Sequence, residues 1–201
     1  MTSDLMTATP AASVPFVSLD DVILHDELAR RPGRAPNLQD ENAAYIALSR
    51  QLESGPTAVL QSLIDAAVSL CDAGTAGVSL LETGSDGVPL FRWTALSGRL
   101  AAAVNGTTPR DFSPCGVCLD RRAPIHLVHP ERYFTYFQSA GVPFCEALVI
   151  PFYVNGAPGG TIWIITHDNT RRFDMEDVRI MTRLATFTGL AYSAISRQPQ
   201  C

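Results

Sequence analysis

The sequence predicts an α+β domain with a central, mostly antiparallel sheet, helices on one face and a long crossover covering the other face. Two pairs of strand-like segments, each joined by a glycine-containing turn, predict the sheet. Amphipathic helical patterns precede the first pair and follow the second. Between the two pairs, residues 97–143 are rich in aromatic side chains and have no regular period. We therefore expect the order helix, hairpin, crossover, hairpin, helix.

Three helices are expected from the apolar spacing of the chain. The first covers 38–51 and can be capped by Asn37, while the second covers 56–70 and begins with a proline at a favourable helix-start position. The last covers 174–195, where Asp174 begins a capping box. Each helix has one apolar side, which favours packing on a sheet.

Four strands are expected in two hairpins. Strands over 76–82 and 88–96 are separated by a Gly-Ser-Asp-Gly turn. Strands over 146–154 and 161–167 are separated by residues 155–160, which begin with an Asn-Gly pair, a strong hairpin signal.

The length and composition fit one globular domain with an extension. The chain has 201 residues, of which 46% are hydrophobic, enough to bury a core. Residues 1–37 are rich in Pro, Ala, Ser and Thr, so we expect a flexible N-terminal extension there. The domain itself is expected over 38–198.

Charge and hydropathy exclude several classes of partner. The formal net charge is -5, so no nucleic acid is expected to bind. The chain has no apolar run of the length that a membrane-spanning helix needs, and its N-terminus does not resemble a secretory signal peptide. We therefore expect a cytoplasmic protein without a membrane partner.

Two cysteines and two histidines in the crossover allow competing interpretations. Cys115 and Cys118 form a CxxC pair, and His126 and His129 follow, so a zinc site can be drawn. The short gap before His126 and the extended conformation imposed by Pro124 disfavour it, and no metal is expected. Alternatively, Cys115 begins a short helix whose N-terminus would lower its pKa and make it sensitive to oxidants. Simple packing is the third interpretation.

A ligand pocket is expected between the sheet and residues 98–143, because concave apolar sites form where a long loop closes over a scaffold. Aromatic side chains and one thiol of the crossover would line it, the two tryptophans would form the sheet-side wall, and one histidine would act as a polar anchor. The same aromatics could instead fill a core, and the histidine could be a surface residue. The expected binding residues are Trp93, Phe112, Cys115, His129, Tyr133, Phe134, Phe137 and Trp163.

The signatures of several enzyme classes are absent from the sequence. There is no phosphate-binding loop, no nucleophile elbow and no HExxH zinc motif. All 15 basic residues are arginine, which excludes mechanisms that need a lysine Schiff base or a phosphate-clamping lysine. A binding module is therefore favoured over an enzyme.

A linked set of motifs resembles GAF domains, most closely those at the N-terminus of bacterial sensor histidine kinases. The resemblance covers roughly residues 38–196. The motifs are AGVSLLE at 76–82, FRW at 91–93, DFSPCG at 111–116, LDR at 119–121, HPER at 129–132, VIPF at 149–152, GTIW at 160–163 and RFDMED at 172–177.

The resemblance implies a GAF-like fold, related to PAS and profilin folds, and a sensory or regulatory role. The module would bind a small molecule of unknown identity, or sense redox state, and signal through its terminal helices. It would pair as a homodimer through the helices at 38–51 and 174–195 and act on a histidine kinase or another signalling partner. Bilin-binding relatives attach the pigment at a Cys-His pair, whereas Gly116 follows Cys115 here, so no covalent bilin is expected.

Two alternatives to a sensor stay open at the level of sequence. The segment around Cys115 and the strand 146–151 also resemble free methionine sulfoxide reductase, a thiol oxidoreductase of the same fold. The region where that enzyme carries its attacking cysteine has none here, which leaves Cys118 or Cys145 as the partner of Cys115. The other alternative is a dimerisation module with a filled core.

Overall fold

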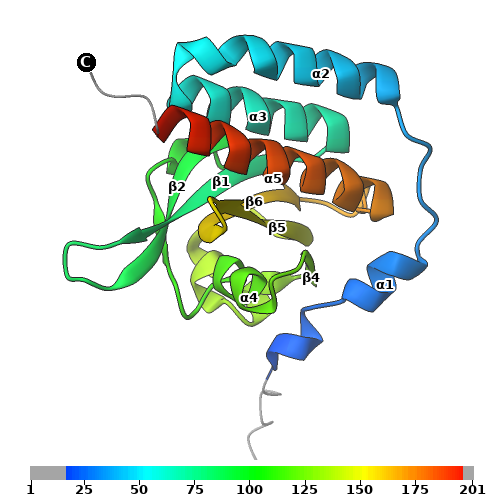
Figure 1. Ribbon diagram of the computed structural model, residues 1–201. Coiled ribbons are helices and arrows are strands. Elements are labelled where there is room, and N and C mark those ends of the chain that lie inside the picture. Colours follow the sequence, from blue (N-terminus) through cyan, green and yellow to red (C-terminus); the bar gives the residue numbers. More distant parts are fainter. Residues whose placement is uncertain (1–16, 197–201) are drawn as a thin grey trace, which may run out of the picture.

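The computed structural model describes residues 17–196, and Figure 1 shows a sheet between a helical layer and a crossover layer. Six strands lie in the order β3-β2-β1-β6-β5-β4, and every neighbouring pair is antiparallel. The predicted α+β class with an antiparallel sheet is confirmed. The strands are β1 (Thr75–Thr83), β2 (Pro89–Gly98), β3 (Thr107–Pro109), β4 (Ile125–Val128), β5 (Glu146–Val154) and β6 (Ala157–Thr166).

Three helices form one layer, as the sequence predicts. They are α2 (Leu38–Gln51), α3 (Pro56–Cys71) and α5 (Met175–Ser196). Helices α3 and α5 pack on the strands, and α2 packs on α3. The Asn37 side chain accepts a hydrogen bond from the Asp40 backbone N–H at 3.2 Å, which caps α2 as expected. Within residues 17–196, no helix has an apolar stretch long enough to cross a bilayer.

The crossover between β2 and β5 covers the opposite face of the sheet. It contains α4 (Pro114–Arg121) and the 3-10 helices η3 (Ala101–Ala103), η4 (Pro130–Arg132) and η5 (Thr135–Ser139). It also contributes the edge strands β3 and β4, which the sequence does not predict. Strands of three and four residues are too short to show a period, and they form because β2 and β5 offer them backbone partners.

The turn between β5 and β6 is shorter than the sequence predicts. Asn155 and Gly156 have φ angles of 53° and 82° and form the tight turn. Strand β6 therefore starts at Ala157 rather than at Thr161, so the predicted strand start is wrong. Pairing with β5 holds residues 157–160 in an extended conformation despite their low strand propensity.

The two faces of the central strands belong to two separate cores. On β5, Leu148 and Ile150 face the helices, whereas Val149 faces the crossover. On β6, Ile164 faces the helices and Trp163 faces the crossover. Each central strand therefore contacts the helical layer on one side and the crossover on the other.

The described part of the N-terminal segment packs along the edge of the sheet. The Val128 backbone N–H donates to Val22 O at 2.8 Å, and the Leu24 N–H donates to His126 O at 3.0 Å. Val22 and Leu28, which lies in α1 (His25–Arg30), are fully buried. The sequence predicts a flexible extension here, but two apolar side chains and the open edge of β4 are sufficient to hold this segment. Residues 1–16 of the expected extension lie outside the described residues.

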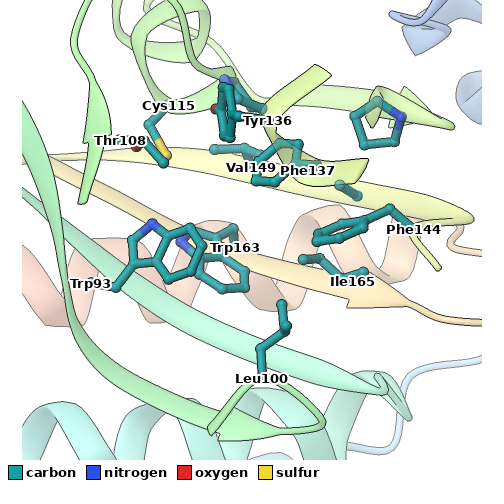
Figure 2. Close-up of a pocket in the computed structure, with 13 residues that line it drawn as sticks. Trp93, Leu100, Thr108, Cys115, Tyr136, Phe137, Phe144, Val149, Trp163 and Ile165 are labelled. Atoms are coloured by element: carbon teal, nitrogen blue, oxygen red, sulfur yellow. The ribbon is translucent and has the colours of Figure 1, made fainter. Parts of the chain in front are cut away.

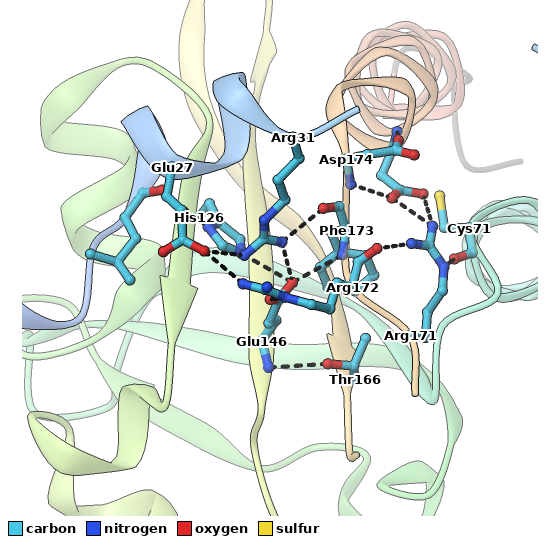
Figure 3. Close-up of polar contacts among 12 residues, drawn as sticks. Glu27, Arg31, Cys71, His126, Glu146, Thr166, Arg171, Arg172, Phe173 and Asp174 are labelled. Carbon is cyan, nitrogen blue, oxygen red and sulfur yellow. Dashed lines mark hydrogen bonds and ion pairs between the residues drawn. The ribbon is translucent and has the colours of Figure 1, made fainter. Parts of the chain in front are cut away.

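A buried carboxylate at the start of β5 binds this segment to the rest of the domain (Figure 3). Glu146 accepts hydrogen bonds from Arg31 at 2.9 Å, the Phe173 backbone N–H at 2.9 Å, Arg172 at 3.1 Å and His126 Nε2 at 3.2 Å. Burial alone would raise the pKa of Glu146, but the hydrogen bonds from His126, Arg31, Phe173 and Arg172 hold it well below its usual range.

A second set of ion pairs joins the same segment to the first turn of α5. Arg34 donates to Asp174 Oδ1 at 3.0 Å and lies 2.7 Å from Asp177 Oδ1. Arg171 also donates to Asp177, at 2.7 and 2.8 Å. Both aspartates accept hydrogen bonds from backbone N–H groups of that turn, so the start of α5 is fixed by a satisfied polar network.

Candidate functional site

A small apolar hollow lies between the sheet and the crossover (Figure 2). Its cavity volume is about 30 Å³, which is room for about two water molecules. A larger ligand therefore enters only if a lining side chain moves. The lining residues are Trp93, Leu100, Thr108, Pro114, Cys115, Pro130, Tyr136, Phe137, Phe144, Ala147, Val149, Trp163 and Ile165.

Two tryptophans form one wall of the hollow. The rings of Trp93 and Trp163 meet edge to face with centroids 5.8 Å apart. The indole Nε1 of Trp163 donates to Ser79 Oγ at 2.8 Å. Gly77 pairs with Trp163 across the β1–β6 ladder, and a Cβ there would lie 2.3 Å from the indole ring. The glycine therefore makes the space in which this ring lies.

Aromatic rings of the crossover form the opposite side. Tyr136 and Phe137 lie on η5, with ring centroids 4.4 Å apart, and Phe137 stacks on Phe144 at 4.7 Å. Phe144 is fully buried, whereas Tyr136 and Phe137 are only half-buried. These two half-buried rings can turn outward at a lower cost in buried area than Phe144.

The structure separates the binding residues expected from the sequence into two groups. Trp93, Cys115, Phe137 and Trp163 line the hollow. The other aromatics form an adjoining cluster in which Phe112 contacts Tyr133 and Phe134, with centroids 5.6 and 5.4 Å apart.

His129 is also outside the lining. Its Nδ1 lies 3.3 Å from Glu131 Oε1, and 44% of its side chain is exposed. His129 is therefore not placed to act as a polar anchor in the hollow.

Two lining residues that sequence reasoning did not select carry a hydroxyl group. Thr108 Oγ1 and Tyr136 Oη are buried and have no hydrogen-bond partner among the described residues. Tyr136 stands in the aromatic run of 133–137, but nothing in that run distinguishes it. Thr108 lies on β3, which is too short for its inward side to be recognised. Buried hydroxyls without a partner are unfavourable, and residues 17–196 supply none for these two.

The cysteine thiols are buried rather than activated. Cys115 is 6% exposed at the start of α4, and burial raises its pKa, contrary to the lowering expected from the helix N-terminus. Burial also raises the pKa of Cys118 and of Cys145. All three are free thiols and stay protonated near neutral pH, which disfavours nucleophilic attack.

The crossover histidines are not arranged with the cysteines for metal binding. Cys118 donates to the Ala123 and Val149 carbonyls at 3.4 Å, whereas His126 contacts Glu146. Among residues 17–196, no cluster of three or more His, Cys, Asp or Glu side chains is placed to hold a metal ion.

A wider groove of about 550 Å³ lies between the β5–β6 turn and α5 and is open to solvent. It is lined in part by Tyr153 and Leu190, which are 38% and 68% exposed. None of the buried polar atoms without a partner belongs to its lining. The apolar hollow under the crossover is therefore the better candidate for a small-molecule site.

Solved structures resemble this chain in fold at low sequence identity. The GAF domain of a phosphoenolpyruvate-protein phosphotransferase from Coxiella burnetii has a TM-score of 0.65 and 15% identity, covering 79% of this chain and 96% of that one. Free methionine-R-sulfoxide reductase from Neisseria meningitidis, in complex with its substrate, has a TM-score of 0.64 and 14% identity, covering 85% and 98%. The second GAF domain of DevS from Mycobacterium smegmatis has a TM-score of 0.57 and 20% identity, covering 70% and 95%.

No curated protein matches the chain significantly by sequence. The family model for the GAF domain matches residues 53–192, which includes the whole sheet, α3, the crossover and most of α5. The match covers more than half of the sequence, and the six-stranded sheet with its aromatic crossover agrees with it. The chain therefore belongs to the GAF domain family.

Proposed function

We propose that this GAF domain is a sensory module that binds a small molecule in the hollow between the sheet and the crossover. Trp93, Cys115, Phe137 and Trp163 would contact the ligand directly. The cluster of Phe112, Tyr133 and Phe134 would support the crossover around it.

The observation that carries the proposal is the chemical mismatch of the hollow. Its lining is apolar and well packed, yet it contains two buried hydroxyls without partners, on Thr108 and Tyr136. A core that served packing alone would gain stability by replacing them with Val and Phe. A binding site retains such groups because the ligand supplies the missing hydrogen bonds.

The central strands offer a route from the hollow to α5. Ala147 and Val149 line the hollow, while Leu148 and Ile150 on the same strand pack in the helical core with α5. A ligand that displaces the crossover rings would favour one arrangement of this strand and of the helix behind it. The output would pass through the terminal helices.

The proposed partners are a second copy of the chain and a signalling protein such as a histidine kinase, in the cytoplasm. Exposed apolar side chains on the outer helices, Ile46 on α2 and Leu190 on α5, are 56% and 68% exposed and would suit a homodimer. The alternative of a thiol oxidoreductase loses support because Cys115, Cys118 and Cys145 are buried with raised pKa values.

A pocket-filling variant tests the proposal. A fragment library would be screened by tryptophan emission, since both tryptophans of the chain line the hollow. Ala147→Leu places extra methyl groups in the hollow and should abolish the response. Ala185→Leu, an equally buried alanine on α5 in the other core, controls for overpacking and should preserve it. The proposal fails if no fragment changes the emission, or if Ala147→Leu binds as tightly as the wild type.

A further inference from the structure

We propose, on the basis of the function proposed above, that the ligand is an uncharged, ring-sized apolar molecule with one hydroxyl or carbonyl group, whose oxygen bonds to Thr108 or Tyr136. Neither residue belongs to the set that the sequence indicates. The class follows from the charge, the hydrogen-bonding capacity and the size of the hollow.

The lining has no group that would neutralise a charged ligand. None of the thirteen lining residues is Asp, Glu, Arg or His. Burial raises the pKa values of the two titratable lining groups, on Cys115 and Tyr136, so both remain neutral. A carboxylate, phosphate or ammonium placed here would lose its hydration without gaining an ion pair. Charged metabolites are therefore excluded as a class.

The two unpartnered hydroxyls determine which hydrogen bonds the polar group of the ligand must form. A hydroxyl can donate one hydrogen bond and accept others. A ligand carbonyl would accept from one of these hydroxyls, and a ligand hydroxyl would either donate to it or accept from it. The rest of the ligand would contact carbon atoms of the two indole rings and the Val149 and Ile165 side chains. One polar atom is thus the complement of this site.

The size follows from the side chain that must move. The cavity of about 30 Å³ is too small for any organic ring. Of the lining aromatics, Trp163 and Phe144 are at least 95% buried, whereas Trp93, Tyr136 and Phe137 are half-buried. Phe137 is the one of these three that has no polar atom, and it lies on η5. Turning Phe137 outward vacates the volume of one phenyl ring next to Tyr136 and Phe144. The vacated space accepts a ligand of about that size.

Three matched probes test the class: phenol, toluene and benzoate. They share one ring and differ only in a hydroxyl, a methyl or a charged group. Binding would be followed by the emission of Trp93 and Trp163 in the wild type, in Thr108→Val/Tyr136→Phe, in Phe137→Ala and in the control Tyr45→Phe. Tyr45 also has a buried hydroxyl without a partner among the described residues, but it lies on α2 and packs against the helical core on the other side of the sheet.

We expect phenol to bind and benzoate not to bind. The preference for phenol over toluene should fall about tenfold in the double variant, which is the effect of one lost hydrogen bond in a dry site, and should not change in Tyr45→Phe. Phe137→Ala should bind both neutral probes more tightly, because the ring no longer has to be displaced.

Each other outcome is decisive. If phenol and toluene bind with a ratio that the double variant does not change, or if benzoate binds best, the ligand class is wrong while a small-molecule site in the hollow stands. If no probe binds to the wild type or to Phe137→Ala, both the ligand class and the hollow as a binding site are overturned.

Discussion

The carboxylate of Glu146 and the hydroxyls of Thr108 and Tyr136 are all buried polar groups, and the domain treats them in opposite ways. Glu146 is 4% exposed and accepts hydrogen bonds from three side chains and one backbone N–H. The hydroxyls of Thr108 and Tyr136 are equally inaccessible and have no partner among the described residues. A buried carboxylate with four donors fixes one arrangement of the groups around it. A buried hydroxyl without a partner lowers the stability of the free domain, and a ligand that supplies the partner would raise it. Under the proposed function, this difference distinguishes a structural site from a ligand-binding site within one domain.

The largest expected effect comes from breaking the satisfied region. Glu146→Ala leaves Arg31, His126 and the Phe173 N–H buried without their acceptor, and it should lower the free energy of unfolding by about 3–5 kcal/mol. Denaturant unfolding measures the change. Glu82→Gln, which removes a half-exposed pair with Arg92, should cost less than about 0.5 kcal/mol. Equal losses in the two variants would show that the cluster does not hold the fold.

The same cluster gives stability a defined pH dependence. Because the pKa of Glu146 is lower in the folded chain than in the unfolded one, its contribution is complete above the ordinary glutamate value of about 4.3 and is lost as the pH falls below it. The stability difference between the wild type and Glu146→Gln should therefore be constant from pH 8 to about pH 5 and shrink under acid. A difference that grows on acidification would contradict the hydrogen-bonded carboxylate.

A smaller effect is expected from closing the hollow. Gly77→Ala places a Cβ 2.3 Å from the Trp163 ring and 2.6 Å from Leu96 Cδ2, so the indole must move toward the hollow. We expect a loss of about 1–3 kcal/mol in the free energy of unfolding, measured with denaturant, together with a change in tryptophan emission. Unchanged emission would mean that the indole does not lie across β1.

The smallest change has the opposite sign. Tyr136→Phe removes a buried hydroxyl without a partner, so the ligand-free protein should become more stable by about 1 kcal/mol. Thermal unfolding of the two proteins side by side checks this. A loss of stability instead would show that the hydroxyl already has a partner inside the domain, and the contrast between the two regions would disappear.

The main helices and strands of this domain can be predicted from the sequence, because the patterns that specify them are local. The apolar spacing of 56–70, the Asn155-Gly156 turn and the Asp174 cap each act over a few residues and reappear in the structure. The edge strands β3 and β4 cannot be predicted in this way, because they form only by pairing with β2 and β5.

The site is only partly predictable for the same reason. The composition predicts that the crossover supplies a layer of aromatic side chains. Because the segment is irregular, it has no period from which the inward-facing rings could be identified. Phe137 and Phe112 are equivalent by sequence, yet Phe137 lines the hollow and Phe112 is 41% exposed. The partners of Glu146 include Arg31, 115 residues earlier in the chain, a contact that no local pattern encodes.

The most direct measurement of the central claim uses the two tryptophans as reporters. Labelling with 5-fluorotryptophan gives one fluorine signal from Trp93 and one from Trp163, and both side chains line the hollow. On titration with phenol, both signals should shift and saturate with the same dissociation constant, and Ala147→Leu should abolish the shifts. If neither signal moves at millimolar phenol in the wild type or in Phe137→Ala, the hollow is a packing defect and not a binding site.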